Sequence, residues 1–227
     1  MTKKLDEIIE MADAQRTRQI QRLTTMRTDL TGDKFKLLFA IRANQTMVEH
    51  KSIKEFIIDD ENRGVLNLMY YYATRTNPDK INPLAGIILN GAYGCGKSIM
   101  ISAFCKVLND LQYTGNEPII EVHSVELADQ IRLNGVIPYC RRPLLIQDLG
   151  KEPNLVNAFG TVVNPISNLL AIRAEYGSLT FGSTNMTMEM IEKHYCEFIS
   201  KRINEHVNRI FLPGKSRRPD YSINQPK

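Results

Sequence analysis

One octapeptide constrains this chain more than any other segment: it has the form G-x-x-x-x-G-K-[ST]. It follows a short apolar run, residues 87–89, and precedes a helix-length stretch with apolar residues at helical spacing. Its glycines let backbone N–H groups point inward at an anion, and the N-terminus of the next helix adds partial positive charge. The octapeptide therefore predicts a phosphate-binding loop that consists of Gly91, Ala92, Tyr93, Gly94, Cys95, Gly96, Lys97 and Ser98.

Short apolar runs recur along the chain with helix-length segments between them. Buried strands that alternate with helices favour a parallel α/β architecture, so we predict a five-stranded parallel sheet flanked by helices. A helix before the fourth run is marked by Asn164 as N-cap, Pro165 in the first turn and Gly177 at the end. The five runs lie at 87–89, 119–122, 144–146, 179–181 and 210–212.

The chain before this α/β pattern is helical in character. Apolar side chains at helical spacing predict a helical N-terminal segment, residues 1–60, ahead of a core formed by residues 61–227. The acidic run 59–61 marks the start of a further helix. Between residues 12 and 20 the apolar stripe is interrupted, and a helix with so thin a stripe buries little surface by itself. The segment is therefore either an addition to the core or a surface for a partner.

Chemically useful side chains follow the strands that we expect beside the loop. Lys97 would reach the β- and γ-phosphates of a nucleotide, and the Ser98 hydroxyl would ligate Mg²⁺. Asp148 ends the third apolar run and supplies a carboxylate for the metal. Asn185 follows the fourth run and places an amide where ligands bind in open α/β sheets, so it can orient a water toward the γ-phosphate. ATP and Mg²⁺ are the cofactors that this set predicts.

Composition limits the class of protein further. The chain has 227 residues, 43% of them hydrophobic, which suits one large domain or a core with a small addition. No apolar run approaches the roughly 18 residues of a membrane span, so we expect a cytoplasmic protein without a membrane partner. The cysteines are too far apart for a zinc site or a disulfide framework; they are Cys95, Cys105, Cys140 and Cys196.

The net charge of +4 is unevenly distributed. Residues 193–227 hold eight Lys or Arg and three acidic residues, and residues 14–28 hold four arginines and no acid. Such runs are either solvated helix faces or surfaces for nucleic acid.

Four segments together resemble the AAA+ ATPases, specifically the DnaC/IstB-like branch of bacterial helicase loaders and transposition ATPases. They are ILNGAYGCGKS, LLIQDLGKE, LTFGSTN and SKRINEHVNRIFLPGKSRR. The resemblance covers about residues 65–218 and implies that Asn185 is the sensor-one residue. It also implies that Arg202 is an arginine finger that reaches a neighbouring subunit, and that residues 214–217 correspond to the closing G-x-S-R segment.

One position departs from the family pattern. The family usually has two adjacent acids before Leu-Gly or Ile-Gly, whereas this chain has Gln147 followed by Asp148. Glu152 lies four residues beyond Asp148. Either Asp148 takes the metal role alone or hydrolysis is impaired, so we expect at most a weak ATPase.

The resemblance implies a helicase loader that assembles with ATP into a homo-oligomer, holds single-stranded DNA and delivers a replicative helicase docked on its N-terminal segment. An IstB-like transposition ATPase, whose partner would be a transposase, is the main alternative. Because Gln147 stands where the family has an acid, a nucleotide-gated scaffold with little hydrolysis is a further alternative. A small-molecule kinase is disfavoured because the chain has no Arg-rich lid, and a GTPase because it has no N-K-x-D motif.

Overall fold

A computed structural model describes residues 2–153, 156–158 and 161–217, and its centre is a five-stranded sheet in the order β2-β3-β6-β1-β7. Every neighbouring pair is parallel, which confirms the predicted architecture. The strands are β1 (Gly86–Asn90), β2 (Ile120–His123), β3 (Leu144–Leu149), β6 (Thr180–Thr184) and β7 (Val207–Phe211).

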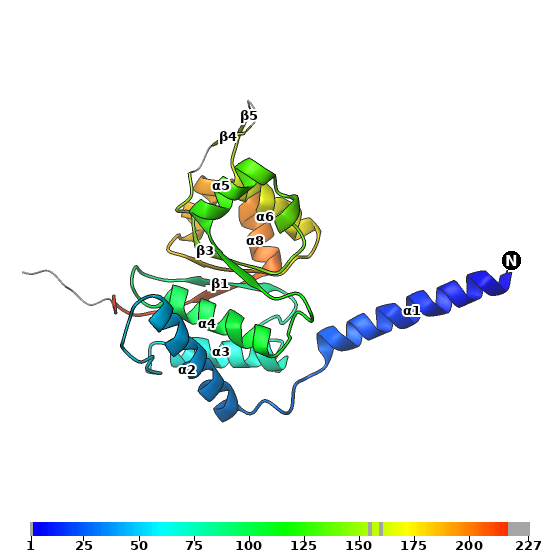
Figure 1. Ribbon diagram of the computed structural model, residues 1–227, viewed down its shortest axis with the longest axis horizontal. Coiled ribbons are helices and arrows are strands. Elements are labelled where there is room, and N and C mark those ends of the chain that lie inside the picture. Colours follow the sequence, from blue (N-terminus) through cyan, green and yellow to red (C-terminus); the bar gives the residue numbers. More distant parts are fainter. Residues whose placement is uncertain (1, 154–155, 159–160, 218–227) are drawn as a thin grey trace, which may run out of the picture.

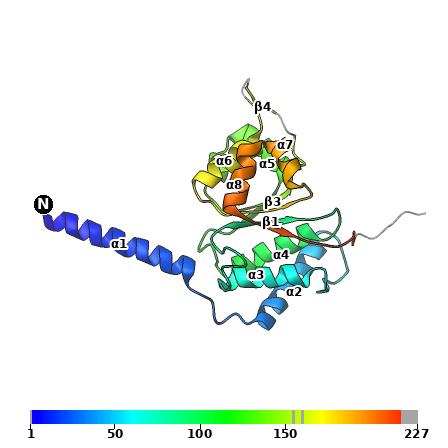
Figure 2. The same cartoon turned by 180° about the vertical axis from the view of Figure 1, so that it is seen from behind.

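Helices cover both faces of this sheet (Figures 1 and 2). One face carries α2 (Gly32–Glu49), α3 (Arg63–Thr74) and α4 (Lys97–Asp110), and the other carries α5 (Ser124–Asn134), α6 (Pro165–Glu175), α7 (Met188–Tyr195) and α8 (Glu197–His206). Successive strand residues point to opposite faces, so Ile87 and Leu89 enter the first core and Ile88 enters the second. The sheet therefore separates two apolar cores.

The register brings the carboxyl ends of the strands to one edge. Asn90, the last residue of β1, pairs with Thr184 of β6 and with Phe211 of β7. His123 of β2 pairs with Gln147 of β3. The loop after β1 and the residues that end β2, β3 and β6 therefore lie at the same edge of the sheet.

The N-terminal helices differ in how they contact the core. Helix α1 (Thr2–Thr24) extends away from the sheet in Figure 1, and Leu5, Ile8 and Ile9 on it are exposed. Helix α2, in contrast, buries Phe35 and Phe39 in the same core as α3 and α4. Residues 25–31 and 50–58 contain no helix, which limits the predicted helical segment to α1 and α2. The domain boundary at residue 60 stays a prediction.

Several local features refine the predicted elements. The Asn164 side chain caps α6 as predicted, accepting a hydrogen bond from the Ser167 N–H at 2.8 Å. The single helix expected before β7 is two helices, because Cys196 adopts φ 84°, which interrupts helical geometry.

The sequence patterns did not predict three short elements. These are η1 (Ile137–Tyr139) and the antiparallel pair β4 (Val156–Ala158) and β5 (Thr161–Val163). Within the described ranges, no helix is long and apolar enough to cross a membrane.

Candidate nucleotide site

The predicted phosphate loop lies between β1 and α4, as its sequence context requires. Gly94 and Gly96 adopt φ values of 77° and 105°, which favour glycine. A Cβ atom at Gly91 would lie 2.4 Å from the Leu212 carbonyl oxygen, so this position also has no room for a side chain. The loop is therefore closely packed backbone, as a cradle for phosphate oxygens requires.

Lys97 begins α4 and folds back over the loop. Its side chain is buried, and its Nζ donates hydrogen bonds to the carbonyl oxygens of Gly91 at 2.8 Å and Ala92 at 2.7 Å. Burial lowers the pKa of Lys97, against the opposing effects of Cys95 and Asp148. A phosphate in the loop would offer this ammonium group an anionic acceptor in place of two neutral carbonyls.

The closing G-x-S-R segment, residues 214–217, packs directly against this loop. The Arg217 backbone N–H donates to the Gly94 carbonyl oxygen at 2.9 Å. The Arg217 guanidinium donates to Asp59 at 2.6 Å and to Glu61 at 2.7 Å. The hydrogen bond from Arg217 lowers the pKa of the Asp59 carboxyl group. Sequence reasoning missed both acids as site residues, because their partner lies more than 150 residues away along the chain.

Asp148 lies at the carboxyl end of β3 in the left-handed region, with φ 57°. Its carboxylate accepts a hydrogen bond from Lys151 Nζ at 2.6 Å and lies 3.3 Å from His123 Nε2. Burial opposes ionisation, but the interactions with Lys151 and His123 prevail and lower the pKa of Asp148. Asp148 is therefore an ionised carboxylate with two basic neighbours.

Gln147 precedes Asp148, and its side chain points toward α4. Its Oε1 accepts a hydrogen bond from the Ser183 hydroxyl at 2.6 Å. Its Nε2 donates to the Ser98 carbonyl oxygen at 3.3 Å and to Glu121 Oε1 at 2.7 Å. The side chain at position 147 thus lies beside the first turn of α4, where the family pattern has its first acid.

The two remaining polar candidates at this edge have different environments. Asn185 follows β6, and its buried Oδ1 has no hydrogen-bond partner among the described residues. Glu152 is buried and accepts hydrogen bonds from the Gly150 N–H, at 2.9 Å, and from the Tyr195 hydroxyl. Asn185 is therefore available to a ligand or water, whereas Glu152 fastens the turn after β3 to α7.

Arg202 lies away from the phosphate loop of its own chain. It is on α8, where it makes an ion pair with Glu205 at 3.4 Å and lies over the Phe198 ring at 5.2 Å. It lines a small cavity with Thr180 and Val207, the first residues of β6 and β7. Those strands begin at the edge opposite the loop, so the structure does not bring Arg202 to the other candidate residues.

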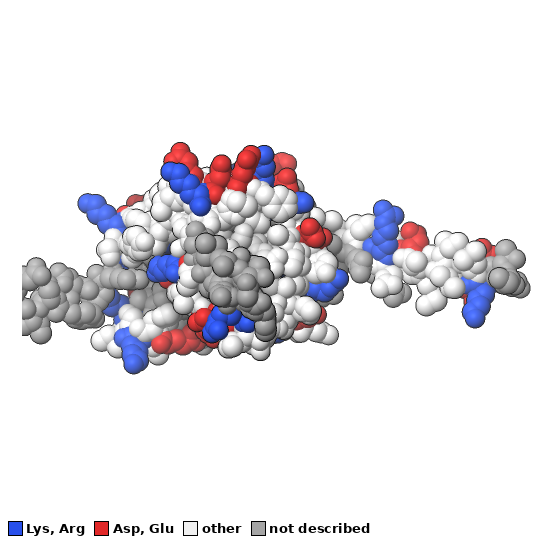
Figure 3. Space-filling model, turned by 90° about the horizontal axis from the view of Figure 1, so that it is seen from above, with Lys and Arg blue, Asp and Glu red and all other residues white. Residues whose placement is uncertain are grey.

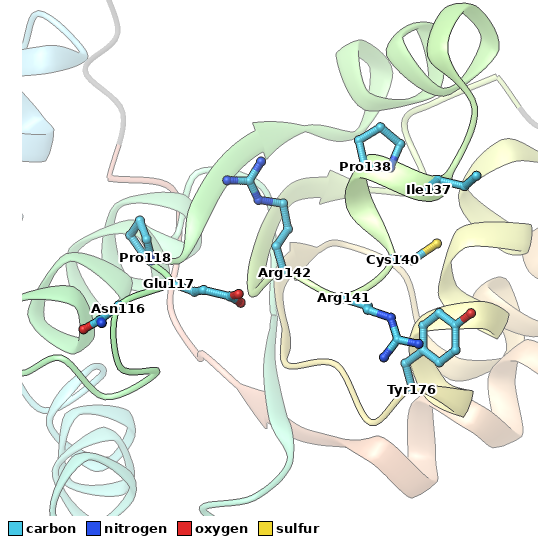
Figure 4. A pocket seen from close by; sticks show the side chains of 9 residues that line it. All are labelled: Asn116, Glu117, Pro118, Ile137, Pro138, Cys140, Arg141, Arg142 and Tyr176. Carbon is cyan, nitrogen blue, oxygen red and sulfur yellow. The ribbon is translucent and has the colours of Figure 1, made fainter.

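A larger cavity of about 450 Å³ is also remote from the loop (Figure 4). It is lined by Pro118 and Arg142, which precede β2 and β3, and by Arg141, whose guanidinium lies 3.9 Å from the centre of the Tyr176 ring. This cavity is thus at the amino edge of the sheet, and the nucleotide candidates are at the carboxyl edge.

The predicted basic surfaces are described in part. Arg16 on α1 is exposed, whereas Arg218 and Lys227 in the basic C-terminal stretch lie outside the described residues. On the face seen in Figure 3, Lys and Arg side chains are mixed with Asp and Glu. This face therefore does not present its described charges as a single basic patch.

The residues at the carboxyl edge fit a nucleotide with Mg²⁺. The glycine cradle has the close packing that a phosphate site needs, and the Asn185 oxygen lacks a partner in the described part of the chain. The same part contains no group of three or more His, Cys, Asp or Glu residues that could hold a metal. Mg²⁺ at nucleotide sites takes few protein ligands and obtains the rest from phosphates and water, so Ser98 and Asp148 remain suitable candidates.

Comparison of the sequence with protein-family models gives no match, and comparison with curated proteins gives none. Solved structures do match. The DnaC helicase loader aligns with a TM-score of 0.55 and 15% identity, over 70% of this chain and 93% of that one. DnaI aligns with a TM-score of 0.54 and 22% identity, over 72% of this chain and 87% of that one. The chain therefore shares the fold of the DnaC helicase loader and DnaI, a five-stranded parallel sheet with helices on both faces.

Proposed function

We propose that this protein binds Mg-ATP at residues 91–98 and uses the bound nucleotide to control assembly as a helicase loader. The observation that carries the proposal is the convergence of the glycine loop, Lys97, Asp148 and Asn185 at one edge of the sheet. In this assignment the loop N–H groups and Lys97 bind phosphate oxygens.

The remaining site residues divide the other tasks. Ser98 and Asp148 would hold Mg²⁺, which when bound neutralises phosphate charge. Asn185, whose Oδ1 has no hydrogen-bond partner among the described residues, positions a water near the terminal phosphate. The Asp148 carboxylate, which pairs with Lys151 and His123 in this structure, would exchange these partners for the metal. Hydrolysis by the isolated protein is slow, because Gln147 adds no negative charge beside Ser98.

Assembly completes the site in this proposal. Arg202 is remote from its own loop, so it acts on the nucleotide of a neighbouring copy in a homo-oligomer. Single-stranded DNA binds to the oligomer through arginine and lysine side chains in a salt-sensitive way. A loader of this kind works in the cytoplasm.

The partner surface in this proposal is the N-terminal segment 1–60. Helix α1 extends from the core (Figure 2). It carries exposed apolar side chains, among them Leu5, Ile8 and Ile9. Exposed apolar groups on a projecting helix suit a protein partner. By analogy with the DnaC helicase loader, that partner is a replicative helicase, and residues 61–227 form the ATPase core.

A nucleotide-gated scaffold is the second candidate, favoured by the neutral amide at Gln147. Such a protein binds ATP and assembles but does not need turnover. The two candidates are separated by measuring ATP hydrolysis with and without single-stranded DNA.

The primary test measures Mg-ATP affinity by calorimetry for the parent and for Lys97→Ala. We expect the mutant to bind at least about tenfold more weakly, because it loses a charge-assisted contact with phosphate. Lys106→Ala removes a half-buried lysine of the same helix that pairs with Glu49 of α2, and it is the control. Equal affinity of the parent and Lys97→Ala would reject the assignment.

The loader role is tested by capture of a replicative helicase with the parent protein. We expect capture to be lost when residues 1–24 are deleted.

A further inference from the structure

The position that lacks the expected acid is held by specific hydrogen bonds. Gln147 is buried, accepts from the Ser183 hydroxyl and donates to the Ser98 carbonyl oxygen. These contacts fix the amide beside the turn of α4 that carries Lys97 and Ser98. A carboxylate at this position would have placed negative charge next to Ser98, and the amide does not.

The neighbouring strand brings a carboxylate to that amide. Glu121 on β2 pairs with Leu145, two residues before Gln147, so both side chains lie on the face that α4 covers. Glu121 Oε1 accepts from Gln147 Nε2 at 2.7 Å. Glu121 Oε2 accepts from the Ser102 hydroxyl, one turn beyond Ser98 on α4, at 2.5 Å.

The acid that contacts Gln147 is therefore Glu121 of β2. Asp148, the acid of β3, pairs instead with Lys151 and His123. Among the hydrogen-bond partners of Gln147 within the described residues, Glu121 is the sole acid. A continuous set of hydrogen bonds links its carboxylate through the Gln147 amide to the first turn of α4.

We propose that Glu121 replaces the missing acid of the metal site, so that the negative charge has moved from β3 to the adjacent strand. Glu121 is a positioning residue: it acts on the Mg²⁺ of bound ATP through Gln147. Residues that act on a metal through its nearer neighbours tune metal affinity by about 10–100-fold. This inference rests on the proposed function, since it concerns the same nucleotide site.

The test measures ATP affinity with and without Mg²⁺ by calorimetry, and its readout is the ratio of the two dissociation constants. Glu121→Gln keeps an oxygen that can accept from Gln147 but removes the charge. We expect this variant to lose most of the Mg²⁺ enhancement, by about tenfold or more. Glu117→Gln removes an acid from the turn before β2, at the opposite edge of the sheet, and is the control. The control should keep the parent ratio.

The exchange variant carries both Glu121→Gln and Gln147→Glu, so the acid returns to position 147, where the family pattern has it. We expect this variant to recover the increase in ATP affinity that Mg²⁺ gives to the parent. Gln147→Glu alone places two carboxylates in contact, so it should bind Mg-ATP less well than the exchange variant. An unchanged ratio in Glu121→Gln, with a parent-like melting temperature, would overturn the inference while leaving ATP binding intact. If Glu121→Gln does not fold, an exchange variant that folds without the enhancement overturns it. A parent protein that binds no ATP overturns the proposed function itself.

Discussion

The guanidinium of Arg217 donates a hydrogen bond to the carboxylate of Asp59 at 2.6 Å, and this contact joins the C-terminal segment to the turn before α3. The same guanidinium donates a hydrogen bond to the Glu61 carboxylate, and the Arg217 backbone N–H donates to the Gly94 carbonyl oxygen of the phosphate loop. Arg217 therefore links the loop with the segment that leads from the N-terminal helices into the core. A displacement of the loop backbone would therefore act on that segment through the contacts of Arg217.

Replacing Arg217 should affect nucleotide binding more than stability. The ion pairs are partly exposed, so Arg217→Ala should cost about 1 kcal/mol of unfolding free energy or less. The loss leaves Asp59 and Glu61 uncompensated beside the loop, and we expect ATP affinity to fall about tenfold, which corresponds to about 1.4 kcal/mol. Calorimetry and urea unfolding measure the two effects. Lys215→Ala removes the same charge from an exposed neighbour, and an equal loss of affinity there would contradict this role.

The ionised state of Asp148 should appear in the pH dependence of stability. Its folded pKa is lowered, so its contribution is present above the unfolded pKa of about 3.9 and is lost as pH falls through the folded pKa. The melting temperature of the parent should therefore exceed that of Asp148→Asn near neutral pH, and the two should converge below about pH 4. A constant difference across this range would show that the effect is not electrostatic. Asp148→Asn should also abolish ATP turnover.

Local sequence signals predicted the sheet and the loop because both depend on short-range patterns. An apolar run falls on each of the five strands, although β7 begins three residues before its run, and the glycine spacing defined the turn after Asn90. The Asn164 cap was predictable for the same reason, since the capping oxygen and the N–H it accepts from are three residues apart. These features need no information about the rest of the fold.

The contacts around the loop were not predictable in this way, because they join distant parts of the chain. The partner of Arg217 is set by where residue 59 lies after folding, and Glu121 meets Gln147 only because β2 and β3 are neighbours in the sheet. The break at Cys196 was missed because a positive φ at a non-glycine residue leaves no clear signal in a helical pattern. A motif thus located the candidate site, and the topology supplied its surroundings.

A buried arginine should contribute strongly to stability. Arg173 is 1% exposed and donates to the Thr180 hydroxyl at 3.0 Å and the Arg142 carbonyl oxygen at 2.8 Å, and also to the carbonyl oxygens of Tyr139 and Leu179. Burial lowers its pKa to about 10. Arg173→Ala leaves these acceptors unsatisfied, so we expect a loss of about 2–4 kcal/mol in unfolding free energy.

Urea unfolding measures this loss, and Arg141→Ala, a surface arginine of the nearby cavity, is the matched control. The control should lose less than about 1 kcal/mol, because its guanidinium contacts a ring at the surface. Equal losses in the two variants would contradict the structural role of Arg173.

The final prediction concerns a nucleotide site shared between subunits. Arg202 lies near the first residues of β6 and β7, at the edge of the sheet opposite its own loop. An arginine supplied by a neighbour stabilises charge in phosphoryl transfer and raises the rate by about 10³–10⁵ where it operates. We therefore expect Arg202→Ala to bind ATP like the parent but to lose turnover. Lys97→Ala should lose ATP binding at its own loop but keep the Arg202 side chain that it supplies to a neighbour.

Mixing these two inactive variants tests the shared site directly. An interface that joins the intact loop of one variant to the intact Arg202 of the other restores a complete site, so part of the parental turnover should return and should depend on the mixing ratio. Arg209→Ala, which removes an exposed arginine from β7, serves as the control and should retain turnover without a partner. Co-assembly is confirmed by light scattering with ATP. Co-assembly without any recovery of turnover at any ratio would leave Arg202 with a structural role within its own subunit, where it pairs with Glu205.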